Sequence, residues 1–125
     1  GHRPASEIAW CYDHCRVFVM TSRTEACPNV VLESLAHGCL AVSTAAPPMP
    51  EFFRNCALTY QAGSATSLAS QLRIVDAWTP RQRAARSERA LDRAREFSWD
   101  LNIATTLASL RRACRIAPSS VRRAA

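Results

Sequence analysis

Two carboxylates separated by seven residues are the first candidates for chemistry in this sequence. They belong to Glu25 and Glu33, and the block between them holds a Pro-Asn pair followed by three aliphatic residues. An apolar run at 17–20 precedes the block, and a helical pattern that stops at Gly38 follows it. This order of strand, polar loop and helix puts the block at the carboxyl end of a strand, where α/β sheets bind ligands. We therefore interpret it as a ligand-facing loop.

The start of the helix after this loop favours a bound anion. The first N–H groups of a helix have no partners within it, and the helix dipole places positive charge there. Pro28 suits the first helical position and has no N–H of its own. The free donors would then belong to Cys27, Asn29 and Val30, and a phosphate fits such a site.

The two carboxylates would flank this anion site. Glu33 lies beyond the first helical turn, where its carboxylate can accept two hydrogen bonds from a vicinal diol such as a ribose. Glu25, on the loop, can accept from hydroxyls of the group that the phosphate carries. Together they indicate a sugar nucleotide rather than a plain nucleotide. The alternative is that Glu33 is a solvated helix residue and Glu25 a loop charge, and spacing alone divides the two interpretations about evenly.

The rest of the chain is predicted to hold this loop at the edge of a parallel sheet. A nearly continuous apolar run predicts a buried strand at 16–20, and further strands are predicted at 39–43 and 57–60. Helical spacing predicts helices at 6–15, 28–37, 66–75, 80–97 and 99–110, with Ser6 and Ser98 as N-caps. Residues 45–50 are predicted to be a Pro-rich loop that cannot be helical, followed by one helical turn at 51–53. The alternation indicates an α/β fold, a Rossmann-like partial parallel sheet with flanking helices.

Composition sets the range of partners. The chain has 125 residues, enough for one domain, and its sixteen basic residues, all arginine, give a net charge of +6. That charge admits nucleotides, phospholipid surfaces or nucleic acid. The Arg-rich helix at 80–97 is interpreted as a solvated face with weak ion pairs, and an RNA- or membrane-binding stripe is the alternative. Nucleic acid is not the expected partner because supporting aromatic residues and a motif are missing.

Two further features concern location and metals. The sequence shows no signal-peptide pattern and no apolar run of about 18 residues, so we expect a cytoplasmic protein that can touch a membrane peripherally. The six cysteines are then expected to be reduced thiols. A zinc site of Cys11, His14, Cys15 and His37 fits no zinc-finger spacing, and we favour small buried apolar residues instead. No metal is predicted.

The block and its surroundings resemble a known enzyme family. The segment VFVMTSRTEACPNVVLESLAHGCLAVST contains a short strand ending in Ser, a Glu, seven residues and a second Glu. It resembles the C-terminal half of GT-B glycosyltransferases of the retaining, family-four or group 1 type. Pro50-Glu51 and Phe97-Ser98-Trp99-Asp100 also match the pattern of that family. The resemblance covers roughly residues 5–112. It implies a partial GT-B C-terminal donor-binding domain at 1–117, followed by a tail at 118–125 that we predict to be disordered.

The resemblance also implies a role for each residue of the block. Glu25 would contact the hydroxyls of the transferred sugar as the catalytic residue, and Glu33 would hold the ribose. The remaining donor-binding residues would be Ser22, Cys27, Asn29, Val30 and Val31, the last four through their backbones. The implied reaction transfers a sugar from a nucleoside-diphosphate sugar, with retention of configuration and without a cofactor or an obligatory metal.

The chain departs from the family pattern in three ways. Thr21-Ser22 stands in place of Pro-Ser, and Ala45-Ala46-Pro47-Pro48 replaces a frequent Gly-Gly. The resemblance also begins partway through the second domain of the family, without the N-terminal acceptor domain or the basic pair on the diphosphate. We therefore predict a fragment or domain of a retaining glycosyltransferase that is inactive without the missing acceptor domain or a partner chain. The alternative is a non-enzymatic module that keeps the fold and associates with a partner or membrane through an open sheet edge.

Overall fold

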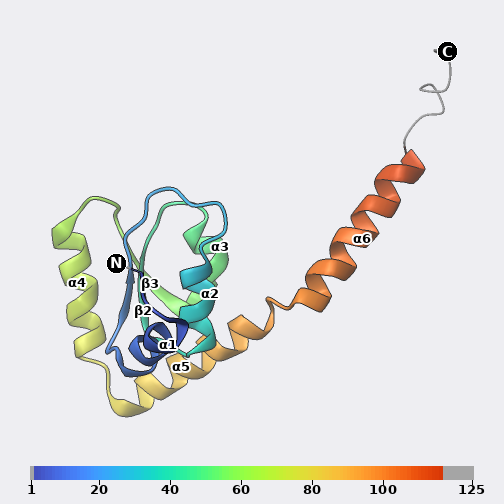
Figure 1. Cartoon of the computed structure of the whole chain (residues 1–125). Coiled ribbons are helices and arrows are strands. Elements are labelled where there is room, and N and C mark those ends of the chain that lie inside the picture. The colour runs from blue at the N-terminus through green and yellow to red at the C-terminus, as the bar shows by residue number, and fades with distance from the viewer. Residues whose placement is uncertain (1, 117–125) are drawn as a thin grey trace, which may run out of the picture.

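The chain folds around a small parallel sheet. The computed structural model describes residues 2–116, so the predicted disordered tail at 118–125 lies outside the described residues. The three strands are β1 (Phe18–Met20), β2 (Ala41–Thr44) and β3 (Ala57–Tyr60), in that order across the sheet (Figure 1). Val19 pairs with Val42, and Val42 with Leu58, both in parallel register. The predicted α/β fold with a parallel sheet is confirmed.

The first two strands differ from their predicted bounds. β1 begins at Phe18 rather than at residue 16, and the Arg16 side chain pairs instead with Asp76 at 2.8 Å. β2 begins at Ala41 rather than at residue 39 because the N–H of Cys39 bonds to Ser34 O in the turn that closes the preceding helix. β3 has the predicted bounds.

The helix that follows β1 is α2 (Asn29–Ala36), and it ends in a Schellman motif. The N–H of Gly38 donates to Leu35 O, and that of Cys39 to Ser34 O, both at 2.9 Å. Gly38 has a φ of +67°, which glycine adopts without steric cost. The predicted stop of this helix at Gly38 is therefore confirmed, and the motif sets where β2 can begin.

A short helix occupies part of the predicted Pro-rich loop. α3 (Met49–Phe53) starts two residues before the predicted helical turn, so the prediction that residues 45–50 are non-helical was wrong for Met49 and Pro50. Pro48 is its N-cap and Pro50 lies in its first turn, where a missing N–H breaks no helical hydrogen bond. Two prolines can therefore begin this helix.

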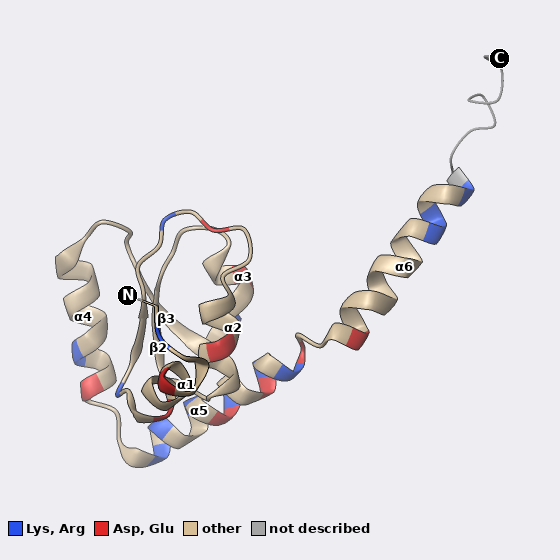
Figure 2. Cartoon of the chain, in the orientation of Figure 1, with Lys and Arg blue, Asp and Glu red and all other residues tan. Residues whose placement is uncertain are grey.

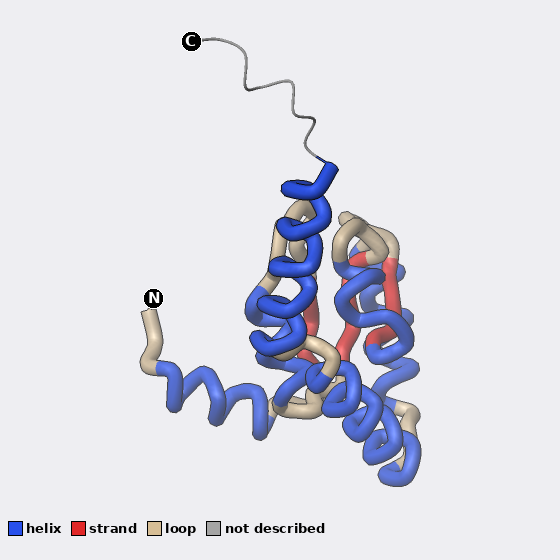
Figure 3. The backbone as a smooth tube through the Cα atoms, turned by 90° about the vertical axis from the view of Figure 1, so that its right-hand side faces the viewer, coloured by secondary structure: helices blue, strands red, loops and turns tan. Residues whose placement is uncertain are grey.

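The remaining helices are α1 (Ala5–His14), α4 (Ala65–Asp76), α5 (Pro80–Arg95) and α6 (Trp99–Ile116). Ser98 caps α6 as predicted, accepting from the Leu101 N–H at 3.1 Å. Ser6 does not cap α1, because the N-cap is Pro4, two residues earlier, and no side chain caps the helix. Figure 3 shows α1, next to the N-terminal label, running away from the strands. None of its residues is buried.

Helices cover both faces of the sheet. α2, α3 and α5 pack together on one face, where the core contains Val31, Leu35, Met49 and Phe53. α4 packs on the other face against β2 and β3 (Figure 1), around a second cluster that includes Val42. All four residues of β2 are buried, as expected for an inner strand of a parallel sheet covered on both faces. α6 extends away from this body (Figure 1).

The Arg-rich helix α5 is only partly the solvated face that its sequence predicted. Arginines lie along its whole length, and acidic residues join them only in its second half (Figure 2). Arg93, however, is only 7% exposed. Its guanidinium donates to Phe52 O at 2.9 Å and to Glu51 O at 2.8 Å, and it pairs with Glu96. The prediction was therefore wrong for this residue, which holds the end of α3 against α5.

Candidate functional site

The loops that follow the strands meet at the carboxyl edge of the sheet. The Thr44 hydroxyl, at the end of β2, donates to Ser22 O in the loop after β1 at 2.9 Å. The Ala45 N–H donates to Tyr60 O, at the end of β3, at 3.0 Å. Ser22 donates its own hydroxyl to Thr24 O at 3.1 Å. Ser22, which was predicted to bind the sugar-nucleotide donor, thus shapes the loop. Its hydroxyl already has a hydrogen-bond partner within the loop.

The start of α2 presents free backbone donors at this edge. Pro28 is the buried N-cap rather than the first helical residue, so the helix begins one position later than predicted. The N–H of Val31 donates to Pro28 O at 2.9 Å, and the Val31 side chain is fully buried. Within residues 2–116, no acceptor receives the N–H groups of Cys27, Asn29 or Val30. Three of the four predicted backbone donors are therefore free, and Val31 is not.

Glu33 has a partner that the sequence did not suggest. Its Oε2 accepts a hydrogen bond from the Tyr12 hydroxyl of α1 at 3.0 Å, and that hydroxyl lies 3.4 Å from Val30 O. Burial, together with this hydrogen bond, raises the pKa of Tyr12 above its ordinary value. Tyr12 therefore stays protonated as a donor at neutral pH. Glu33 itself is exposed to solvent.

Glu25 lies on the exposed loop, three residues before the N-cap of α2. Its carboxylate has no hydrogen bond or ion pair with any residue in the described part of the chain. The carboxylate is therefore open to a ligand. Glu25 and Glu33 share no hydrogen-bond partner within residues 2–116, so their shared role in one site stays a prediction.

Arg23 is a cation of this loop that the sequence analysis did not single out. Its guanidinium reaches the turn after β3, because a Cβ added at Gly63 would lie 2.5 Å from Arg23 Nη2. The side chain thus spans two of the loops at the carboxyl edge. Two arginines earlier in the chain are engaged elsewhere: Arg3 pairs with Glu7 and Arg16 with Asp76.

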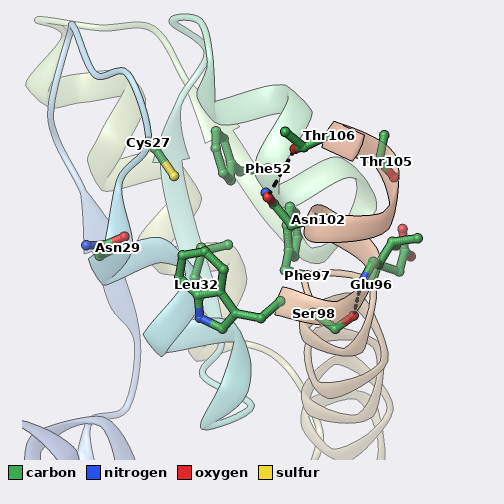
Figure 4. A pocket seen from close by; sticks show the side chains of 12 residues that line it. Cys27, Asn29, Leu32, Phe52, Glu96, Phe97, Ser98, Asn102, Thr105 and Thr106 are labelled. Carbon is green, nitrogen blue, oxygen red and sulfur yellow. Dashed lines mark hydrogen bonds between the residues drawn. The ribbon is translucent and has the colours of Figure 1, made fainter. Parts of the chain in front are cut away.

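A groove of about 610 Å³ opens beside the start of α2 (Figure 4). Cys27, Asn29 and Leu32 form one wall, and Phe52, Phe97 and the first turns of α6 form the other. Phe52 and Phe97 stack with ring centroids 5.7 Å apart. Because residues three apart on a helix share a face, Asn29 and Leu32 face this groove, whereas Val30 and Glu33 face Tyr12. Sequence spacing identified neither α6 as a wall of the groove nor Tyr12 as a partner of Glu33.

The thiols and histidines considered for zinc do not form a cluster. Across the described residues, no three His, Cys, Asp or Glu side chains gather closely enough to hold a metal ion. Cys11 and Cys15 are exposed, so the prediction that they are buried apolar residues was wrong. Cys39 is the buried thiol, 3.9 Å from Cys15 Sγ, and burial raises its pKa to about 12.

Comparison with known proteins gives two findings. A family model described as glycosyl transferases group 1 matches residues 1–75, a range that contains both glutamates. Among solved structures, the chain is similar to sucrose-phosphate synthase from Thermosynechococcus elongatus, with a TM-score of 0.75 and 21% identity. That similarity covers 94% of this chain and 30% of the synthase. A search of curated proteins gave no match. Within the described residues, none of the helices has the length and apolarity needed to cross a membrane.

Proposed function

The chain belongs to the group 1 glycosyl transferases and has their GT-B α/β fold, and we propose that it is the donor-binding part of a retaining enzyme that uses a nucleoside-diphosphate sugar. The observation that carries the proposal is the pair of free N–H groups of Asn29 and Val30, one turn before Glu33. These groups lie at the carboxyl edge of a parallel sheet, where ligands bind.

Each part of the site has a distinct task in this proposal. The free N–H groups and the dipole of α2 hold the diphosphate and stabilise the negative charge that develops on it as the sugar leaves. Glu33 accepts hydrogen bonds from the ribose, and Glu25 accepts from hydroxyls of the transferred sugar. Arg23 adds a positive charge at the same edge. No cofactor or metal takes part in the proposed reaction.

Transfer requires a second substrate, the acceptor. The chain spans 30% of the synthase that it resembles. We propose that an acceptor-binding domain or a partner chain supplies the rest of the active site. Residues 1–125 alone are then expected to bind the donor without transferring its sugar.

Alanine substitutions of the two glutamates test this function because they should affect different ligands. Glu33→Ala is expected to weaken the binding of both a nucleoside diphosphate and its sugar derivative about tenfold, which is the effect of losing one hydrogen bond to a charged group. Glu25→Ala should weaken the binding of the sugar derivative only. Calorimetry with UDP, GDP and ADP and their glucose derivatives measures both effects. Unchanged affinities in Glu33→Ala would show that the ribose assignment is wrong.

A second candidate function, association with a partner or a membrane, is supported by α6. Trp99 is 81% exposed, and Leu101, Ile103, Leu107 and Leu110 are each about half exposed along the same helix. Exposed apolar patches of this kind mark interaction surfaces. Size-exclusion chromatography with light scattering and liposome sedimentation test this function. A monomer at all concentrations that does not sediment with liposomes would exclude it.

A further inference from the structure

We propose that Tyr12 is a positioning residue that orients Glu33 for recognition of the ribose 2′-hydroxyl. This inference rests on the proposed function, because it assigns a partner to the residue that would hold the ribose. Tyr12 lies on α1, and 21 positions separate it from Glu33 in the sequence. The hydrogen bond from its hydroxyl to Glu33 Oε2, 3.0 Å long, is the contact that carries the inference.

The ring of Tyr12 is fixed from two sides. It stacks on His37, just after α2, with centroids 5.3 Å apart, and lies at a tilt 6.1 Å from Phe18 of β1. Asp13, the next residue on α1, bonds to His37 Nδ1 at 2.6 Å and ties the two helices together. The hydroxyl of Tyr12 is therefore held in place by contacts that do not involve Glu33.

A fixed hydroxyl restricts a carboxylate that is otherwise free to move. Glu33 is exposed, and within residues 2–116 Tyr12 is the only hydrogen-bond partner of its carboxylate. Without that bond, a ligand would have to order the side chain on binding, which lowers affinity. With Oε2 held by Tyr12, Oε1 and the remaining lone pairs point in a set direction for a ligand hydroxyl. A 2′-deoxyribose lacks one of the two hydroxyls that such a carboxylate can bind.

The substitution Tyr12→Phe tests the inference because phenylalanine keeps the ring contacts with His37 and Phe18. Calorimetry would compare UDP, GDP and ADP with their 2′-deoxy counterparts, and use the pair that binds best. We expect the wild-type chain to prefer the ribonucleotide about tenfold, as one hydrogen bond to a charged group allows. Tyr12→Phe should reduce that preference to about threefold, since the remaining carboxylate still binds the hydroxyl but is no longer oriented.

Two further variants separate this inference from simpler explanations. Asp13→Ala removes the hydrogen bond between α1 and His37 but keeps the contact between Tyr12 and Glu33, so the preference for ribose should fall less than in Tyr12→Phe. Tyr12→Phe in a Glu33→Ala background should have no additional effect, because the two residues act through one contact. If Glu33→Ala abolishes the preference for ribose but Tyr12→Phe leaves it unchanged, the inference is wrong and the proposed function still stands. Failure of every nucleotide to bind the wild-type chain would overturn the proposed function and the inference with it.

Discussion

Replacing Arg93 with alanine is expected to lower the free energy of unfolding by about 3 kcal/mol, a large part of the stability of a small domain. The Arg93 guanidinium is buried between α3 and α5 and donates to the carbonyl oxygens of Glu51 and Phe52. It also lies 4.3 Å above the ring of Phe97. Alanine would remove both hydrogen bonds, the ion pair with Glu96 and the contact with the Phe97 ring, and would leave a void at this buried position.

Urea unfolding followed by circular dichroism measures this loss. Arg95→Ala is the matched control, because Arg95 lies two residues further along α5 and pairs with Asp92 on the exposed surface. Its loss should change the free energy of unfolding by less than about 0.5 kcal/mol. Equal effects of the two substitutions would show that the buried contacts of Arg93 do not stabilise the fold.

The features that were predicted from the sequence have local causes. β3 and the stop of α2 were placed correctly, because an apolar run bounded by polar residues and a glycine after a helix are local signals. Ser98 was recognised as a cap for the same reason. The parallel sheet followed from the alternation of strands and helices, which leaves few other arrangements.

The features that were missed depend on contacts between distant segments. Arg93 looks like the other arginines of α5 in sequence, and only its packing against a helix 41 positions away sets it apart. Its spacing of three from Ala90, also buried, is a weak sign that the two share an inward face. Tyr12 and Glu33 lie on separate elements, so no spacing rule links them. The groove beside α6 arises from the direction in which that helix leaves the body (Figures 1 and 4).

Removing a single backbone N–H at the start of α2 is expected to weaken nucleoside-diphosphate binding about 10- to 100-fold, because a hydrogen bond to a charged group contributes about 1.5–3 kcal/mol. Asn29→Pro makes this change with little effect on the fold. Asn29 is the first helical residue, where proline is favoured, and its N–H has no acceptor within the described residues. Pro28 has an extended backbone with ψ of 96°, close to the conformation that a following proline requires.

Asn29→Ala is the matched control because it removes the same side chain and keeps the N–H. The measurement is the calorimetric affinity of these two variants for the nucleoside diphosphate that binds the wild-type chain best, with thermal unfolding as a check on the fold. If the free amides of α2 hold the diphosphate, Asn29→Pro will bind it about 10- to 100-fold more weakly than the wild-type chain, and Asn29→Ala will bind it with nearly the wild-type affinity. Equal affinities in two folded variants would contradict the assignment of the diphosphate to this helix start.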